Sequence, residues 1–68
     1  MKPSVGRIVH YIDPLTGKHC AALIIDVDDK DRVNLRVFGH VGSEWTAFVI
    51  SNDETYVMLG SWHWPERV

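Results

Sequence analysis

Residues His19–Val27 read HCAALIIDV and form an almost wholly apolar run. The run is too short for a typical helix and its apolar residues are consecutive, so it predicts a strand that is covered on both faces. We expect this strand at the centre of the sheet. Cys20 is the only cysteine of the chain. It excludes an internal disulfide, as is usual in a reducing cytosol, and is expected to pack as a small buried hydrophobic residue.

Four segments on either side of this run also have the composition of strands. Residues 5–12 are rich in β-branched and aromatic residues, and residues 33–37 alternate apolar and polar side chains. Residues 45–50 carry apolar side chains on both faces, and residues 60–64, with two tryptophans, form a short last strand that Pro65 ends. Turn-forming Pro, Gly, Asp, Asn and Ser separate the segments. The stretch 54–59 is ambiguous and is compatible with one helical turn.

Five short strands without an amphipathic helix favour a small barrel or a curled sheet. We therefore predict an all-β fold, a five-stranded SH3-like barrel that spans residues 1–68 as a single small domain. A chain of 68 residues buries a core of only marginal stability. A homo-oligomer is expected for that reason.

The net charge and the first residues of the chain disfavour some classes of function. A formal net charge of −2 gives no basic field that would attract nucleic acid, so nucleic-acid binding is disfavoured. The start, MKPS, lacks the apolar stretch of a signal peptide, and no later stretch has the length of a membrane span. These features predict a protein of the cell cytoplasm, not of the membrane, whose partner is a small molecule or another protein.

Three stretches carry a resemblance to known sequences. They are GRIVHY at residues 6–11, AALI at residues 21–24 and, above all, GSWHWPE at residues 60–66. With them the chain resembles, over essentially its whole length, a widespread group of short phage and prophage proteins that end in this tryptophan motif. In that group the connection between the third and fourth strands is often longer than residues 39–44 here.

A further likeness is one of class, not of motif. Phage proteins of this size resemble the sponges that sequester nucleotide immune signals, such as the Sequestin and Lockin families, which trap cyclic ADP-ribose derivatives. A sponge needs a tight pocket and no chemistry, and small sponges commonly build the pocket where protomers meet. The likeness implies a non-enzymatic, oligomeric binding protein.

The alternation Trp62, His63, Trp64 places both indoles on one face of a strand and the imidazole on the other. An indole face can stack on a base, with about 1–3 kcal/mol for each stacked base. The alternative is that both tryptophans close the barrel end or fill a subunit interface, which is the commoner use of large aromatic residues. Both interpretations stay open at the level of sequence.

Arg7 and Arg36 lie within predicted strands and offer the planar fork that binds phosphate. Exposed strand positions or ion pairs with aspartates would explain them as well. Tyr11 or Trp45 would close the side of a base pocket. The candidate ligand-binding residues are therefore Arg7, Tyr11, Arg36, Trp45, Trp62, His63 and Trp64.

No metal site, cofactor or catalytic residue is predicted. The four histidines, His10, His19, His40 and His63, form no close ligand pair in sequence, and one cysteine cannot complete a structural zinc set. Residues 26–31 are rich in aspartate but lack the glycine and glutamate of a calcium loop. No nucleophile elbow or phosphate-binding glycine loop is present, which disfavours an enzyme, although cleavage of the bound signal stays open.

The predicted function is that of a phage anti-defence protein. It would sequester a nucleotide-derived host immune signal, a cyclic ADP-ribose derivative or a cyclic oligonucleotide, in a pocket between subunits. The alternative is a phage protein-interaction module that docks a host or virion protein through an apolar strand edge or the tryptophan patch.

Overall fold

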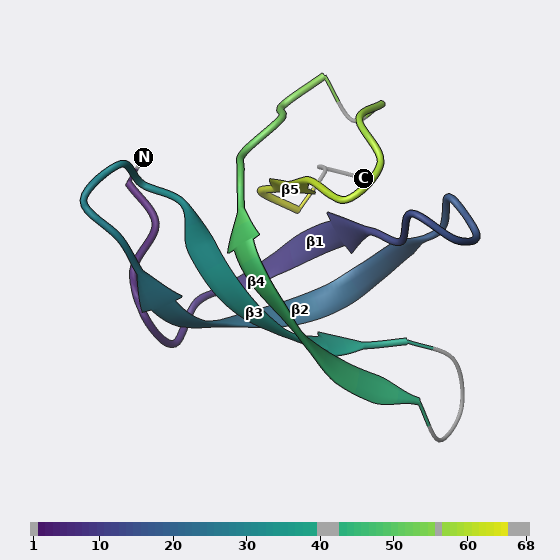
Figure 1. The fold of residues 1–68 in the computed structure, drawn as a ribbon, viewed down its shortest axis with the longest axis horizontal. Coiled ribbons are helices and arrows are strands. Elements are labelled where there is room, and N and C mark those ends of the chain that lie inside the picture. Colours follow the sequence, from purple (N-terminus) through teal and green to yellow (C-terminus); the bar gives the residue numbers. More distant parts are fainter. Residues whose placement is uncertain (1, 40–42, 56, 66–68) are drawn as a thin grey trace.

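The computed structural model describes residues 2–39, 43–55 and 57–65. These residues form one antiparallel sheet in the order β4-β3-β2-β1-β5 (Figure 1). The strands are β1 (Ile8–Ile12), β2 (His19–Val27), β3 (Val33–Phe38), β4 (Glu44–Ile50) and β5 (Trp62–His63). The prediction of an all-β, five-stranded fold is confirmed, with β2 at the centre. The described part of the chain holds no helix that could cross a membrane.

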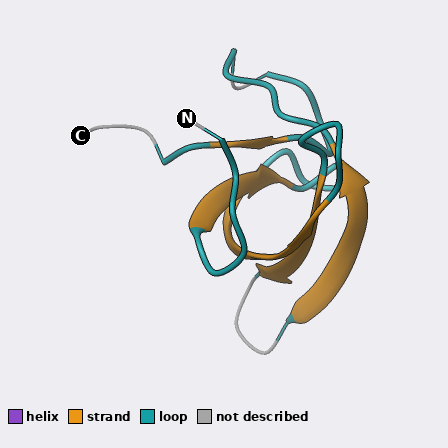
Figure 2. Cartoon of the chain, turned by 90° about the vertical axis from the view of Figure 1, so that its left-hand side faces the viewer, coloured by secondary structure: helices purple, strands orange, loops and turns teal. Residues whose placement is uncertain are grey.

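The predicted closure into an SH3-like barrel is wrong. The sheet curls strongly (Figure 2), but its two edge strands, β4 and β5, do not pair along their length. The backbone of the chain that follows β4 meets β5 in an isolated parallel bridge between Asn52 and Trp62. Because β5 ends after two residues, it is too short to continue the ladder around a cylinder. Gly60 has a φ of 74°, which glycine adopts readily, and it lies in the turn just before β5.

The core lies on the concave side of the curled sheet. Strand β3 shows the predicted alternation, with Val33, Leu35 and Val37 buried and the two residues between them partly exposed. Ala22 and Ile24 of β2 and Val9 of β1 pack in the same cluster. The core is thus built from one face of each central strand.

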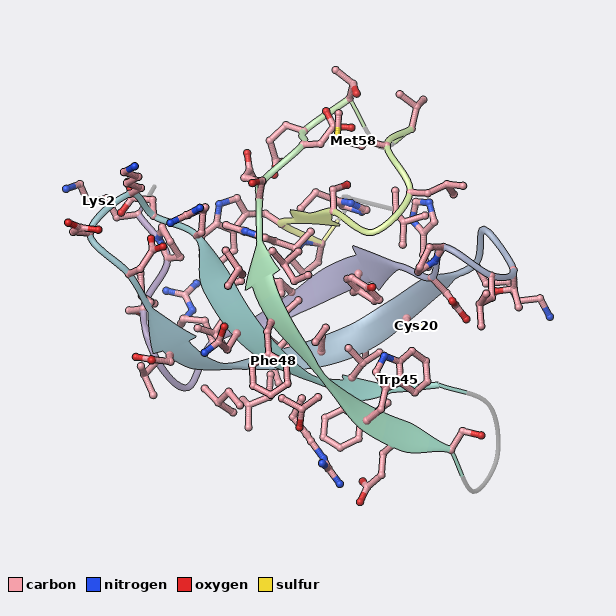
Figure 3. All side chains as sticks on the ribbon, in the orientation of Figure 1. Lys2, Cys20, Trp45, Phe48 and Met58 are labelled. Carbon is pink, nitrogen blue, oxygen red and sulfur yellow. The ribbon has the colours of Figure 1, made fainter. Side chains whose placement is uncertain are left out.

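Strand β2 is not covered on both faces, which corrects the expectation from its composition. Ile25 is 43% exposed, and Cys20 is half-buried instead of buried. Phe48 on the edge strand β4 is 67% exposed (Figure 3). A single-layer sheet has only one face to pack against itself, so these apolar residues remain at the surface of the isolated chain.

Candidate functional site

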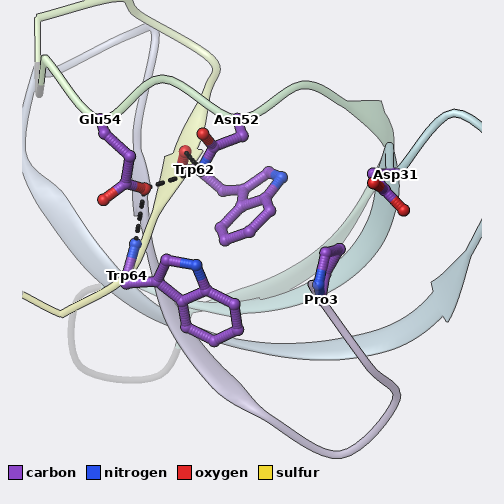
Figure 4. Close-up of a pocket in the computed structure, with 6 residues that line it drawn as sticks. All are labelled: Pro3, Asp31, Asn52, Glu54, Trp62 and Trp64. Carbon is purple, nitrogen blue, oxygen red and sulfur yellow. Dashed lines mark hydrogen bonds between the residues drawn. The ribbon is translucent and has the colours of Figure 1, made fainter. Parts of the chain in front are cut away.

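Two of the predicted residues, Trp62 and Trp64, line a cleft of about 260 Å³. We call it the tryptophan cleft; its lining residues are Pro3, Asp31, Asn52, Glu54, Trp62 and Trp64 (Figure 4). Strand β5 places Trp62, because Trp62 pairs with Tyr11 of β1. On the other side, the Trp62 backbone N–H donates to the Ser51 carbonyl at 3.1 Å. The cleft therefore forms where the chain after β4 meets β5.

The two indoles play different parts in the cleft. Their ring centroids are 5.2 Å apart and their planes meet at 87°, an edge-to-face contact. Trp62 is only 1% exposed and belongs to the core, whereas Trp64 is half-buried. Trp64 is thus the ring that can offer a face to a ligand, and Trp62 forms the floor.

The indole nitrogen of Trp62 is a buried donor. Among the described residues, Nε1 of Trp62 has no hydrogen-bond acceptor. Figure 4 shows this nitrogen on the side of the ring that faces Asp31 and Pro3, both of which line the cleft. A buried N–H without an acceptor costs about 1–3 kcal/mol. Less than 1 Å² of this nitrogen is accessible, so a ligand in the cleft meets the Trp62 ring and not its N–H.

The polar side of the cleft is acidic. Glu54 Oε2 accepts hydrogen bonds from the Trp64 backbone N–H at 3.0 Å and from Asn52 Nδ2 at 2.7 Å (Figure 4). Asp31 supplies a second carboxylate. Carboxylates accept hydrogen bonds from N–H groups and repel phosphate. The cleft therefore favours a neutral or cationic group that carries N–H donors.

Asp53 fixes the loop that carries Glu54. Its Oδ1 accepts hydrogen bonds from the Thr55 hydroxyl at 2.6 Å and the Thr55 N–H at 3.1 Å, and its Oδ2 accepts one from the Met58 N–H at 2.9 Å. The Thr55 hydroxyl and these backbone donors hold the pKa of the Asp53 carboxyl below its ordinary value. The Asp53 N–H in turn donates to the Trp62 carbonyl at 2.8 Å. One aspartate thus links the loop to β5.

Arg7 lies beside the cleft but does not line it. Its guanidinium carbon is 5.3 Å from the centroid of the Trp64 ring, a cation–π contact. The predicted residues Arg7, Trp62 and Trp64 are therefore brought together by the fold.

The other predicted residues lie elsewhere. Tyr11 and Trp45 line a different cleft of about 310 Å³ together with Asp13, Pro14 and Leu15. Burial, followed by the charge of Asp13, raises the pKa of the Tyr11 hydroxyl. The structure does not place Tyr11 or Trp45 among the residues that line the tryptophan cleft.

Arg36 is engaged on strands β3 and β4. Its guanidinium donates to Glu44 Oε1 at 2.8 Å and to Thr46 Oγ1 at 3.2 Å. An ion pair is the kind of alternative that the sequence left open for Arg36, with Glu44 in place of the expected aspartate. Two of its five N–H donors are used within the sheet.

His63 belongs to a group that sequence spacing did not suggest. The imidazoles of His10, His19 and His63 lie next to one another, with ligand atoms all within 4.8 Å. No two of these residues are close in the sequence, so a search for ligand spacing misses them. The signal lies in the strand pairing: a hairpin over residues 13–17 brings His10 and His19 to neighbouring strands. His40 lies outside the described residues.

Comparison with protein-family models, curated proteins and solved structures finds no match for this chain.

Proposed function

We propose that this protein is a non-enzymatic binding module whose tryptophan cleft takes the base of a nucleotide-derived ligand. The observation that carries the proposal is the cleft itself, in which the half-buried Trp64 ring and the carboxylates of Glu54 and Asp31 surround one face of the buried Trp62 indole. The edge of a purine or cytosine base carries ring or carbonyl acceptors beside amino or imino donors. Such an edge would donate to Glu54 or Asp31 while the base lies against the Trp64 ring.

The size of the cleft limits what enters it. Pockets for drug-sized ligands measure about 300–1,000 Å³, and this cleft, at about 260 Å³, falls just below that range. It suits a single base and not a whole cyclic dinucleotide. The acidic lining also keeps phosphate out of the cleft, so the sugar and phosphate would extend from its mouth toward Arg7.

The energetics favour a second protein copy around the rest of the ligand. One stacked base contributes about 1–3 kcal/mol, whereas a Kd of 1 nM corresponds to about 12 kcal/mol. Tight sequestration therefore needs contacts beyond one cleft. A homo-oligomer with the ligand between subunits supplies them, and the half-buried Trp64 would lie at that junction.

The biological role in this proposal follows from the resemblance to short phage proteins. A phage product that holds a cyclic ADP-ribose derivative or a cyclic oligonucleotide in the host cytoplasm would lower the free concentration of an immune signal. Sequestration needs affinity and abundance, and no bond of the ligand has to break.

The test is calorimetric titration of the full chain with cyclic ADP-ribose isomers, cyclic dinucleotides and the free nucleosides. We expect at least one base-containing ligand to bind, and Trp64→Ala to weaken that binding about tenfold or more. Trp45→Ala, which alters the other aromatic cleft, is the matched control and should leave affinity unchanged. A flat signal across the panel, or equal affinity of the Trp64→Ala variant, would refute the proposal.

A second candidate is the protein-interaction module. The observation in its favour is the edge strand β4, where Phe48 is 67% and Val49 57% exposed. An open edge with apolar side chains can add a strand from a partner. In this case Phe48→Asp would abolish capture of one stoichiometric host or virion protein, while base binding would be absent.

A further inference from the structure

The strand register brings three histidines to one face of the sheet. His10 of β1 is the cross-strand partner of His63 of β5. Ile12, two residues further along β1, is the partner of His19 at the start of β2. Residues two apart on a strand share a face, so His19 is the diagonal neighbour of His10. Three adjacent strands, β2, β1 and β5, thus contribute one imidazole each.

The rings are close enough to share one ion. Ring centroids are 4.9 Å apart for His19 and His63, 5.5 Å for His10 and His63, and 6.5 Å for His10 and His19. One ligand nitrogen from each residue can be chosen so that all three lie within 4.8 Å of one another. Zinc–nitrogen bonds of about 2.1 Å in a tetrahedron separate the nitrogens by about 3.4 Å. Closing the triangle needs each nitrogen to move by about 1 Å or less, which side-chain rotation can supply.

The three histidines differ in how deeply they are buried, and this difference suits the binding of an ion from solvent. His63 is fully buried, His10 is half-buried and His19 is exposed. The buried imidazole has a fixed position, whereas the exposed one is able to rotate onto an ion that arrives from solvent. Three nitrogen ligands with one side open to water are the arrangement in which zinc keeps a fourth position for water or a ligand.

We infer that His10, His19 and His63 form a binding site for a divalent transition metal, with Zn²⁺ as the best-matched ion. The cluster contains only imidazole nitrogens, which suit zinc, copper and nickel and not magnesium or calcium. The edge-to-face contacts between the rings show that the imidazoles also pack on one another without an ion. This site is independent of the proposed function, because His63 points to the face of β5 opposite Trp62.

The experiment uses the full chain, purified without a histidine tag and treated with chelator. Calorimetric titration with Zn²⁺ should give one ion per chain, and native mass spectrometry should show the same stoichiometry. Co²⁺ in place of Zn²⁺ should give the intense visible absorption of a four-coordinate site. Absence of stoichiometric Zn²⁺ binding, or the weak absorption of six-coordinate Co²⁺, would overturn the inference.

Variants identify the ligands. His19→Ala is the decisive change, because an exposed side chain can be removed without loss of the fold, and circular dichroism will verify that. We expect His19→Ala and His10→Ala each to lower the affinity for Zn²⁺ by about tenfold or more. His40→Ala and Cys20→Ser are the matched controls, since they remove the remaining imidazole and the only thiol, and both should keep wild-type affinity. Unchanged binding in the His19→Ala variant, or equal loss in a control, would overturn the three-histidine site.

Discussion

The two faces of strand β5 are built in different ways. Trp62 points into the core and is bounded by the chain that follows β4, so the tryptophan cleft depends on residues 51–54 as much as on the sheet. His63 points the other way and meets His10 and His19, which lie on the neighbouring strands of the ladder. A loop therefore shapes one face and strand register shapes the other. Substitutions in the loop should therefore affect the tryptophan cleft, and substitutions in the strands should affect the histidine cluster.

The largest expected effect is that of Trp62→Ala. Removal of a fully buried large aromatic side chain costs about 3–5 kcal/mol of unfolding free energy, and a domain of this length has only about 3–10 kcal/mol in total. Urea unfolding followed by circular dichroism should show a variant that is marginally folded or unfolded. Because both faces depend on β5, base binding and Zn²⁺ binding should be lost together.

Trp64→Ala is the control for this prediction. Trp64 is half-buried, so its removal should cost clearly less stability and should spare the histidine face. A Trp62→Ala variant that unfolds at the wild-type urea concentration would show that Trp62 is not part of the core.

The strands were predictable because their signals are local. The alternation of Val33, Leu35 and Val37 gives the buried face of β3, and the run around Ala22 and Ile24 gives the centre of the sheet. The failure of the sheet to close into a barrel was not predictable, because closure depends on the length of β5. Gly60 and Pro65 bound the motif, but only the three-dimensional path shows that two residues pair.

The sites were predictable only in part, for a related reason. The spacing of Trp62 and Trp64 indicates a shared direction, and Arg7 joins them through the pairing of the segment before β1 with Ile24 of β2. The histidine cluster depends on the register of three strands. A one-residue slip in either pairing would move a histidine to the other face, and sequence alone does not fix the register.

A smaller effect, on the loop that carries Glu54, is expected from acid. The pKa of the Asp53 carboxyl is lower in the folded state than in the unfolded chain, where it is about 3.9. The stabilisation that Asp53 gives the loop is therefore complete above that value and is lost as the pH falls through the lower, folded-state pKa. Tryptophan fluorescence should change in this acid range before the far-ultraviolet circular dichroism of the sheet does.

Asp53→Asn sharpens this prediction. The amide has one acceptor oxygen, so it cannot serve both Thr55 and Met58 as the carboxylate does. The variant should show the acid form of the fluorescence already at neutral pH. Asp13→Asn changes a similar turn, in which Asp13 accepts from the Leu15 N–H at 2.9 Å, and it serves as the control. Identical acid transitions in wild type and the Asp53→Asn variant would contradict the assignment.

The smallest expected effect is that of Arg7→Ala. An exposed cation–π contact contributes about 0.5–1 kcal/mol, so the urea midpoint should fall only slightly, while Trp64 loses the charge that lies over its ring. If the phosphate of a ligand lies at Arg7, affinity for nucleotides should fall and affinity for the free nucleoside should not. Zn²⁺ binding should stay at the wild-type value, because Arg7 contacts the tryptophan face of the β5 segment.

Arg36→Ala is the control for this prediction, because it removes an arginine that is already paired with Glu44. This variant should leave nucleotide affinity unchanged. An equal loss of affinity in both variants would mean that net charge, and not the position of Arg7, attracts the ligand.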